Sequence, residues 1–341
     1  MFAFERGDAC PRRSGMLCHN VRMNVTNIFL RCAVLLFLVS SAMLAAQAPA
    51  APGAPAPTSE TAVLVKQAQQ LNSEGKQDEA LAGYRKALEI SPNDVDAHLG
   101  MGSVLDLKGD YAEARRHLAK AIEVASGADA KERAWRTMAL SYVFECNMGE
   151  AGRLEQQVFD ARMARQDFLS AADVANETAR LYLECGDVDT ADKWYGIGHQ
   201  TAIRKTDMSD ADKNLWLFRW ENAQARIAAR RGQREDALKH VSAAKVALDK
   251  ANNPDQARFY PYLTGYVAFY GGDYKTAIAD LQRADQRDPF ILSLLAQAYE
   301  KSGDQTRATD YYRKVLASNA HNPTNAFARP LAKKKLGTAK P

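Results

Sequence analysis

The sequence holds few of the residues from which catalytic and metal sites are usually built. Its five cysteines and six histidines form no C-x-x-C, H-E-x-x-H or H-x-x-H pair. No Walker loop occurs, and "YGIGHQ" (Tyr195–Gln200) lies in a predicted helix with no preceding strand, so it does not fit a dinucleotide-binding turn. Carboxylates such as those of "SDADK" and "REDA" have the pattern of ordinary solvated helix faces. We therefore assign no catalytic, cofactor-binding or metal-ligating residue, and we favour a binding module over an enzyme.

A strong excess of positive charge is also absent. The formal charge is +4, but residues 1–48 account for most of it, and the remaining chain has 40 basic and 39 acidic residues. Five of these basic residues lie in residues 318–341, which contain no acidic residue. Nothing in this distribution indicates a nucleic-acid-binding face.

Residues 1–48 have the form of a secretory signal peptide. Arg31 precedes the short apolar run Cys32–Val39, and small residues follow. A transmembrane anchor is the alternative, but a spanning helix needs about 20 apolar residues. Translation from Met23 would give a more compact leader than translation from Met1. We expect cleavage between Ala45 and Ala51, contact with a membrane only through the leader during export, and a periplasmic or secreted protein.

Residues 49–60 form a linker rich in proline and alanine, without periodicity. After it, the pattern Gly-x-x-x-x-Ala-x-x-x-(aromatic or Leu)-x-x-Ala recurs seven times. The copies begin at Gly75, Gly109, Cys146, Gly186, Gly232, Gly272 and Gly303. A glycine with this spacing ends one helix in a left-handed conformation, and the alanine that follows lets a second helix approach closely.

The repeat resembles the tetratricopeptide repeat family, whose unit of 34 residues carries small and aromatic residues at these positions. The resemblance covers residues 61–317 and implies an all-α, right-handed superhelical solenoid of about seven helix pairs. Residues 318–341 form a basic C-terminal segment that we expect to cap the last pair. The third copy departs from the pattern, with Cys146 in place of glycine and Glu155 in place of an aromatic residue, so its register is the least certain.

Two cysteines, Cys146 and Cys185, follow the leader. Both fall at the turns between the paired helices of adjacent units. Neighbouring equivalent helices lie roughly 8 to 10 Å apart, and a disulfide requires a Cα separation of about 4.4 to 6.8 Å. We therefore predict two free thiols.

The resemblance implies a concave groove, lined by the first helix of each unit, that holds a peptide or a helix of a partner. Helical phase selects the groove-facing residues of three units: Asp173, Asn176, Arg180 and Leu183 in the fourth, Arg219, Asn222, Arg226 and Ala229 in the fifth, and Phe259, Tyr262, Tyr266 and Phe269 in the sixth. Arginines and amides beside aromatics suit a ligand with an acidic end and an apolar body.

We predict a ligand site formed by Asn176, Arg180, Arg219, Asn222, Arg226, Phe259, Tyr262, Tyr266 and Phe269. The alternative for the aromatic residues is packing between helices, with solvated arginines. The sequence thus favours an exported, non-enzymatic scaffold that binds a protein or peptide partner. A solenoid that binds a small molecule or a glycan, and an enzyme with an unrecognised site, are the other readings.

Overall fold

The computed structural model describes residues 59–338, which form sixteen α-helices and no strand. The predicted leader, the start at Met23 and the linker up to residue 58 lie outside these residues. The helices are α1 (Ser59–Ser73), α2 (Gln77–Ile90), α3 (Val95–Lys108), α4 (Tyr111–Val124), α5 (Ala128–Val143), α6 (Met148–Ala164), α7 (Phe168–Glu184), α8 (Val188–Ala202), α9 (Asp210–Arg230), α10 (Arg234–Ala251), α11 (Pro254–Ala257), α12 (Phe259–Tyr270), α13 (Tyr274–Arg283), α14 (Pro289–Lys301), α15 (Gln305–Leu316) and α16 (Pro323–Lys335).

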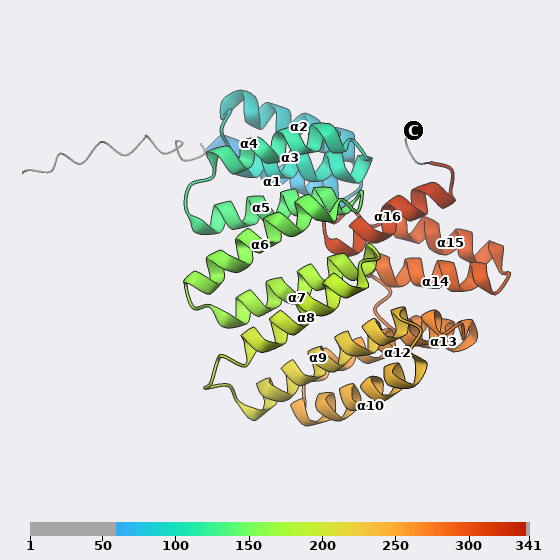
Figure 1. Cartoon of the computed structure of the whole chain (residues 1–341). Coiled ribbons are helices and arrows are strands. Elements are labelled where there is room, and N and C mark those ends of the chain that lie inside the picture. Colours follow the sequence, from blue (N-terminus) through green and yellow to red (C-terminus); the bar gives the residue numbers. More distant parts are fainter. Residues whose placement is uncertain (1–58, 339–341) are drawn as a thin grey trace, which may run out of the picture. The chain divides into compact units, whose positions relative to one another are not determined.

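The helices form seven antiparallel pairs that stack in chain order into a superhelical solenoid (Figure 1). The pairs are α1/α2, α3/α4, α5/α6, α7/α8, α9/α10, α12/α13 and α14/α15, with α11 and α16 outside this scheme. The predicted all-α solenoid of seven pairs is therefore confirmed. None of the described helices is long and apolar enough to cross a lipid bilayer.

The turn inside each pair has the backbone conformation that the repeat predicts. All seven residues at the glycine position have positive φ, and Cys146, which replaces glycine in unit three, has a φ of 51°. Positive φ is uncommon outside glycine, so Cys146 confirms that the third copy keeps the same register as the others.

The small residues of the repeat lie where paired helices touch. The alanine that follows each turn has no exposed surface in any unit: Ala80, Ala114, Ala151, Ala191, Ala237, Ala277 and Ala308. Gly102 shows how tight the contact is, because a Cβ there would lie 2.6 Å from the Leu118 side chain. At the start of α9, Ser209 accepts a hydrogen bond from the Asp212 backbone N–H, as its sequence predicts for an N-cap residue.

The prediction of two free thiols is wrong, because Cys146 and Cys185 form a disulfide with a Cα–Cα distance of 5.4 Å. The expected spacing applies to helices packed along their lengths. Both cysteines lie beyond that region, Cys146 in the turn after α5 and Cys185 at the C-cap of α7. There the chain brings the two backbones closer than the helix axes, and the bond joins units three and four.

Replacing both cysteines with serine should lower the free energy of unfolding by about 2–4 kcal/mol, because the bond closes a loop between residues 39 apart in sequence. Urea unfolding of the wild type with and without reductant, beside the double variant, measures this effect. Mass spectrometry after alkylation without reductant should find the two peptides linked. Two alkylated thiols in the native protein would contradict the bond.

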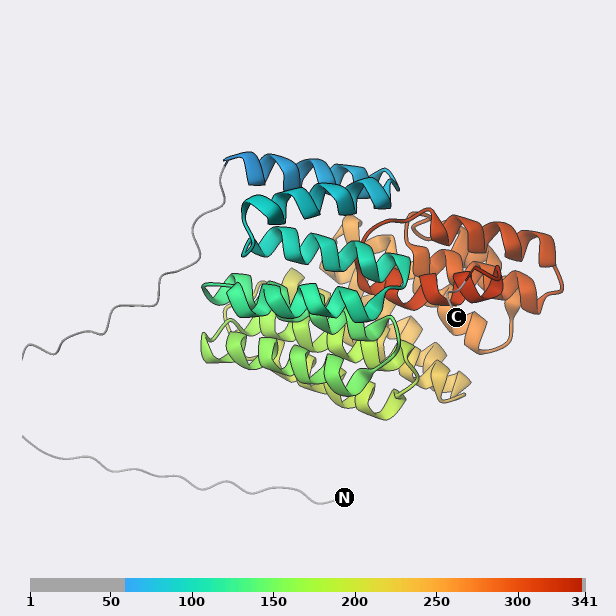
Figure 2. The ribbon, with the colours of Figure 1, turned by 90° about the horizontal axis from the view of Figure 1, so that it is seen from above.

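The C-terminal helix α16 closes the solenoid back onto its early units. It packs against α14 and α15 and also against α5, so red and green-blue helices lie side by side in Figures 1 and 2. Residues 318–341 were expected to cap the last pair. Within the described residues, this segment also reaches units two and three.

Hydrogen bonds from α16 satisfy carbonyl groups at the C-terminus of α3. Arg329 Nε donates to the Leu107 carbonyl at 2.8 Å, and its Nη1 donates to the carbonyls of Leu316 and Ser318. Lys333 Nζ donates to the carbonyls of Leu107 and Lys108, both at 2.9 Å. Cations at this end also complement the helix dipole.

Arg329→Ala should therefore destabilise the protein by about 2–4 kcal/mol, because it removes three hydrogen bonds and takes from the Leu316 carbonyl the donor that Arg329 supplies. Lys334→Ala, at an exposed position of the same helix, is the control and should change stability by less than about 0.5 kcal/mol. Urea unfolding gives both values. Hydrogen exchange should speed up at the C-terminal end of α3 in Arg329→Ala alone, and equal exchange in both variants would contradict the closure.

Candidate binding surface

A cavity of about 280 Å³ lies between the first helices of units four, five and six. We call it the arginine pocket. It is lined by Asp173, Asn176, Glu177, Arg180, Tyr195, Phe218, Arg219, Asn222, Arg226, Gln256, Phe259 and Tyr262.

The structure brings seven of the nine predicted site residues together at this pocket: Asn176, Arg180, Arg219, Asn222, Arg226, Phe259 and Tyr262. Tyr266 has no exposed surface, and Phe269 packs against the core of the last units, so neither lines it. Leu183 and Ala229 are buried as well. The expectation that these four side chains face a groove is wrong.

Tyr262 and Tyr266 of α12 are buried because they belong to the contact between units six and seven. Tyr262 packs edge-to-face on Tyr266 and on Phe290 of α14, with ring centroids 5.8 and 6.5 Å apart. Phe259, which is 37% exposed, is the ring at the pocket's surface. Packing between helices, the alternative considered from the sequence, thus describes Tyr266 and Phe269.

Beneath the pocket, a buried carboxylate holds two of the arginines of α9. Glu184 is 2% exposed, and its carboxylate lies 3.3 Å from Arg230 Nη1 and 3.9 Å from Arg226 Nη1. Arg226 Nη2 donates to the Tyr195 hydroxyl at 2.8 Å, and its Nε donates to Asn222 Oδ1 at 3.1 Å. Burial raises the pKa of Glu184, and the neighbouring arginines oppose that rise. The cluster fixes Arg226 and Asn222 in place.

Arg180 differs from these arginines, because within residues 59–338 it forms no ion pair. Its Nε is buried without a hydrogen-bond partner, as is the Tyr262 hydroxyl nearby. Its guanidinium carbon lies 5.5 Å from the centre of the Phe290 ring. The pocket therefore offers one cation and one hydroxyl that a ligand can engage.

Gly198 of α8 makes room for Asn176. A Cβ at this position would lie 2.6 Å from Asn176 Oδ1 and 3.2 Å from the Ala172 carbonyl. The small residue that the fourth repeat carries at position 198 therefore also determines where the Asn176 amide lies in the arginine pocket.

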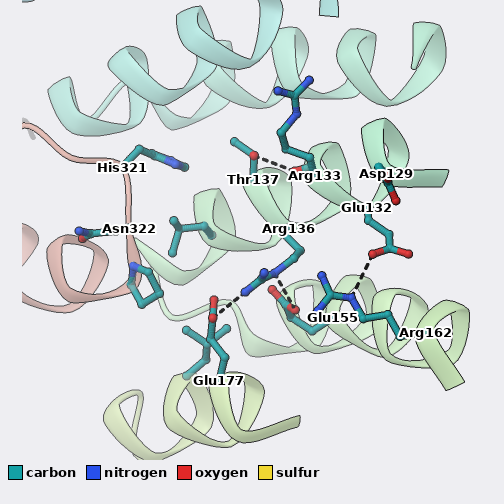
Figure 3. A pocket seen from close by; sticks show the side chains of 13 residues that line it. Asp129, Glu132, Arg133, Arg136, Thr137, Glu155, Arg162, Glu177, His321 and Asn322 are labelled. Carbon is teal, nitrogen blue, oxygen red and sulfur yellow. Dashed lines mark hydrogen bonds and ion pairs between the residues drawn. The ribbon is translucent and has the colours of Figure 1, made fainter. Parts of the chain in front are cut away.

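A second cavity, of about 400 Å³, lies between α5, α6, α7 and the segment before α16 (Figure 3). We call it the glutamate pocket. It is lined by Asp129, Glu132, Arg133, Arg136, Thr137, Leu140, Glu155, Arg162, Glu177, Leu181, His321, Asn322 and Pro323. Glu177 lines both pockets, so the two adjoin. None of these residues was predicted as a site residue.

Glu155 occupies the core position that the large residue fills in the other repeats. The equivalent residues are Tyr84, Leu118, Tyr195, Val241, Leu281 and Tyr312, all buried. Glu155 is only 2% exposed, and burial raises the pKa of its carboxyl group to about 8, with Arg136 opposing and Glu177 reinforcing the rise. The one sign of this pocket in the sequence was the glutamate at position 155, where the repeat pattern calls for an aromatic residue or leucine.

The raised pKa should make stability depend on pH. The folded state holds a proton on Glu155 up to about pH 8, whereas the unfolded chain releases it near its ordinary pKa of 4.5. Stability from this group is thus present at low pH and is lost as pH rises from about 4.5 to about 8, by on the order of 5 kcal/mol in full. Glu155→Leu should therefore gain stability over the wild type as pH rises, in urea unfolding at several pH values. A difference independent of pH would contradict a buried, protonated Glu155.

The histidines form one pair that their spacing in sequence does not indicate. Nδ1 of His98 and Nδ1 of His117 lie 3.1 Å apart, and His98 Nε2 lies 2.9 Å from the Pro92 carbonyl. Burial lowers the pKa of both imidazoles, which favours their neutral forms. Among residues 59–338, no group of three or more histidine, cysteine, aspartate or glutamate side chains is arranged to hold a metal ion.

Comparison with known families and structures agrees with this fold. Residues 68–109 match a family described as TPR repeat, and residues 95–127 and 291–326 match families described as tetratricopeptide repeat. A tetratricopeptide repeat protein from Parabacteroides merdae ATCC 43184 is similar, with a TM-score of 0.50, 11% identity and coverage of 82% of this chain and 99% of that one. The apo form of RapI has a TM-score of 0.53, 11% identity and coverage of 82% and 100%. At these identities the likeness shows the fold alone.

The fold class is thus a helical-repeat solenoid, the architecture of a protein-interaction scaffold. The chain is a tetratricopeptide repeat protein, with matches over residues 68–127 and 291–326.

Proposed function

We propose that this protein is an exported, non-enzymatic scaffold that binds a protein or peptide partner in the arginine pocket. The observation that carries the proposal is Arg180, whose buried Nε has no hydrogen-bond partner among residues 59–338. A buried donor without a partner is costly, and an acidic group of a partner would satisfy it. Asn176 and Asn222, on neighbouring helices beside it, can pair with a peptide backbone.

The alternative of a glycan or small molecule stacked on an aromatic stripe finds less support. Stacking needs an exposed ring face, and Tyr262 and Tyr266 are buried edge-to-face within the core. Phe259 offers one partly exposed ring. One ring beside two amides and an arginine suits a peptide side chain better than a sugar platform.

Partner binding in the arginine pocket can be tested by fluorescence anisotropy. The labelled probes are peptides selected on the intact protein from a random library. Arg180→Met removes the charge and keeps an apolar stem, so it should weaken the binding of an acidic peptide at least about tenfold and reduce the salt dependence. Asn176→Ala should weaken binding by about three- to tenfold.

Arg85→Met, at an exposed position of α2, is the matched control and should leave affinity unchanged. Circular dichroism and unfolding curves confirm that each variant folds. If the Arg180 and Asn176 variants both bind selected peptides within about twofold of the wild type, a difference of about 0.4 kcal/mol, the arginine pocket is not the partner site.

Export rests on the form of the leader, and the disulfide between Cys146 and Cys185 supports it, because disulfides persist mainly in oxidising compartments. The mature protein recovered from the periplasm or the medium should begin between residues 46 and 52. N-terminal sequencing measures this directly. A chain that still begins at Met1 or Met23 in that fraction would contradict cleavage, and a chain found only in the cytoplasm would contradict export.

A further inference from the structure

The glutamate pocket contains a buried carboxylate that the fold does not use. In six of the seven repeats the position of Glu155 packs an apolar or aromatic side chain between helices. A carboxyl group there gains no packing and loses hydration, which costs free energy unless it is paired. Glu155 Oε2 has no hydrogen-bond partner in the described part of the chain.

The other charged groups of the pocket have partners among the described residues. Glu132 accepts hydrogen bonds from Arg162 Nε at 3.1 Å and from Arg165 Nη2. Glu177 lies 2.6 Å from Arg136 Nη2. The two remaining basic groups of the lining pair with carboxylates that lie outside the pocket: Arg133 with Asp96 at 2.7 Å, and His321 with Asp106 at 2.8 Å.

Arg136 does not donate a hydrogen bond to the Glu155 carboxyl group. Its Nε lies 3.8 Å from Glu155 Oε2, beyond hydrogen-bond distance, and it too is buried without a hydrogen-bond partner. Figure 3 shows Arg136 between Glu155 and Glu177, and the shorter of its two contacts is with Glu177. Asp129, at the rim, is fully exposed and lies 3.8 Å from Arg165.

The charge balance favours a cationic ligand. Four carboxyl groups and three arginines line the pocket, and the surplus carboxyl is the one whose oxygen has no partner. An anion placed against Glu155 Oε2 would meet like charge whenever this carboxyl group is ionised. An ammonium or guanidinium group would donate N–H bonds to Oε2 and would leave the existing pairs intact. The cavity of about 400 Å³ has room for a side chain.

We propose that the glutamate pocket binds an alkylammonium or guanidinium group through Glu155 Oε2. The group is that of a lysine, an arginine or a free polyamine. The site is separate from the arginine pocket, although Glu177 borders both.

Binding is coupled to release of a proton. Burial raises the pKa of Glu155 to about 8, so near pH 7 the carboxyl is mostly protonated. When the cation binds, the Glu155 O–H bond breaks, the proton goes to the buffer and the carboxylate pairs with the cation. Arg136, Arg162, Arg133 and His321 face the same space, as do the carboxylates of Asp129, Glu132 and Glu177. Affinity therefore rises with pH from about 6 to about 8 and then levels off.

The test uses the mature, disulfide-bonded protein and four probes: Nα-acetyl-lysine N-methylamide, Nα-acetyl-arginine N-methylamide, spermidine, and Nα-acetyl-norleucine N-methylamide as the uncharged match for lysine. Calorimetry near pH 7 in two buffers of different ionisation enthalpy gives affinity and protons released. At least one cationic probe should bind at least about tenfold more tightly than the norleucine probe, with release of close to one proton. Tighter binding of spermidine than of both amino-acid probes would assign the cation to a polyamine, and the reverse to a protein side chain.

Glu155→Gln keeps the shape of the side chain and removes the charge, and Glu155→Leu restores the usual residue of the repeat. Both should weaken cation binding at least about tenfold and abolish proton release, while Glu155→Leu stays folded and is more stable. Glu150→Gln, half-exposed on the same helix and outside the pocket, is the matched control. Arg180→Met should leave cation binding unchanged, which separates this site from the proposed partner groove.

Three results would overturn the proposal. They are absence of cation binding at concentrations up to about 10 mM, equal binding of the lysine and norleucine probes, and binding to Glu155→Gln within about twofold of the wild type. If Glu155 had a purely structural role, Glu155→Gln and Glu155→Leu would change the stability of the protein but would not change the proton-linked binding of the cationic probes.

Discussion

Close contact between paired helices, made at one small residue in every repeat, is the constraint on which the rest of the structure depends. Ala151 and its six equivalents have no exposed surface, so the two helices of each unit approach as near as their backbones allow. A left-handed residue at each turn sets the return of the second helix. Because each unit repeats this geometry, neighbouring first helices face a common side, and the pockets form between them.

Stacking leaves the last unit of a solenoid without a following neighbour, and here α16 covers that unit and also reaches units two and three. Its contacts with α14 and α15 cover the last unit, and Arg329 and Lys333 bind the open carbonyls at the end of α3. The segment that leads into α16 also contributes His321 to the wall of the glutamate pocket. The closure thus shapes the proposed cation site as well as the fold.

Repetition made the helix pairs predictable, because seven copies of one pattern reinforce each other, and most of the arginine pocket followed from helical phase. Contacts that do not repeat could not be read in this way. Tyr266 has the phase of a groove residue, but its ring packs within the last units. The disulfide depends on how far two turns depart from the helix axes, and no spacing in the sequence encodes that distance. The return of α16 to α3 joins segments more than 200 residues apart, beyond any periodicity.

Glu155 shows how a departure from a repeat carries information that the repeat itself does not. Its position weakened the sequence match of unit three, yet Cys146 and Ala151 hold that unit in the common register. A solenoid can hold a buried carboxyl group in one of seven equivalent core positions because the neighbouring repeats stabilise the affected repeat through their interfaces. The free-energy cost of burying Glu155 is therefore confined to one unit. That unit lies where the arginine pocket and the glutamate pocket share Glu177. Under the two proposals made above, an acidic group and a basic group of one partner would pair in different pockets, which would fix that partner's orientation.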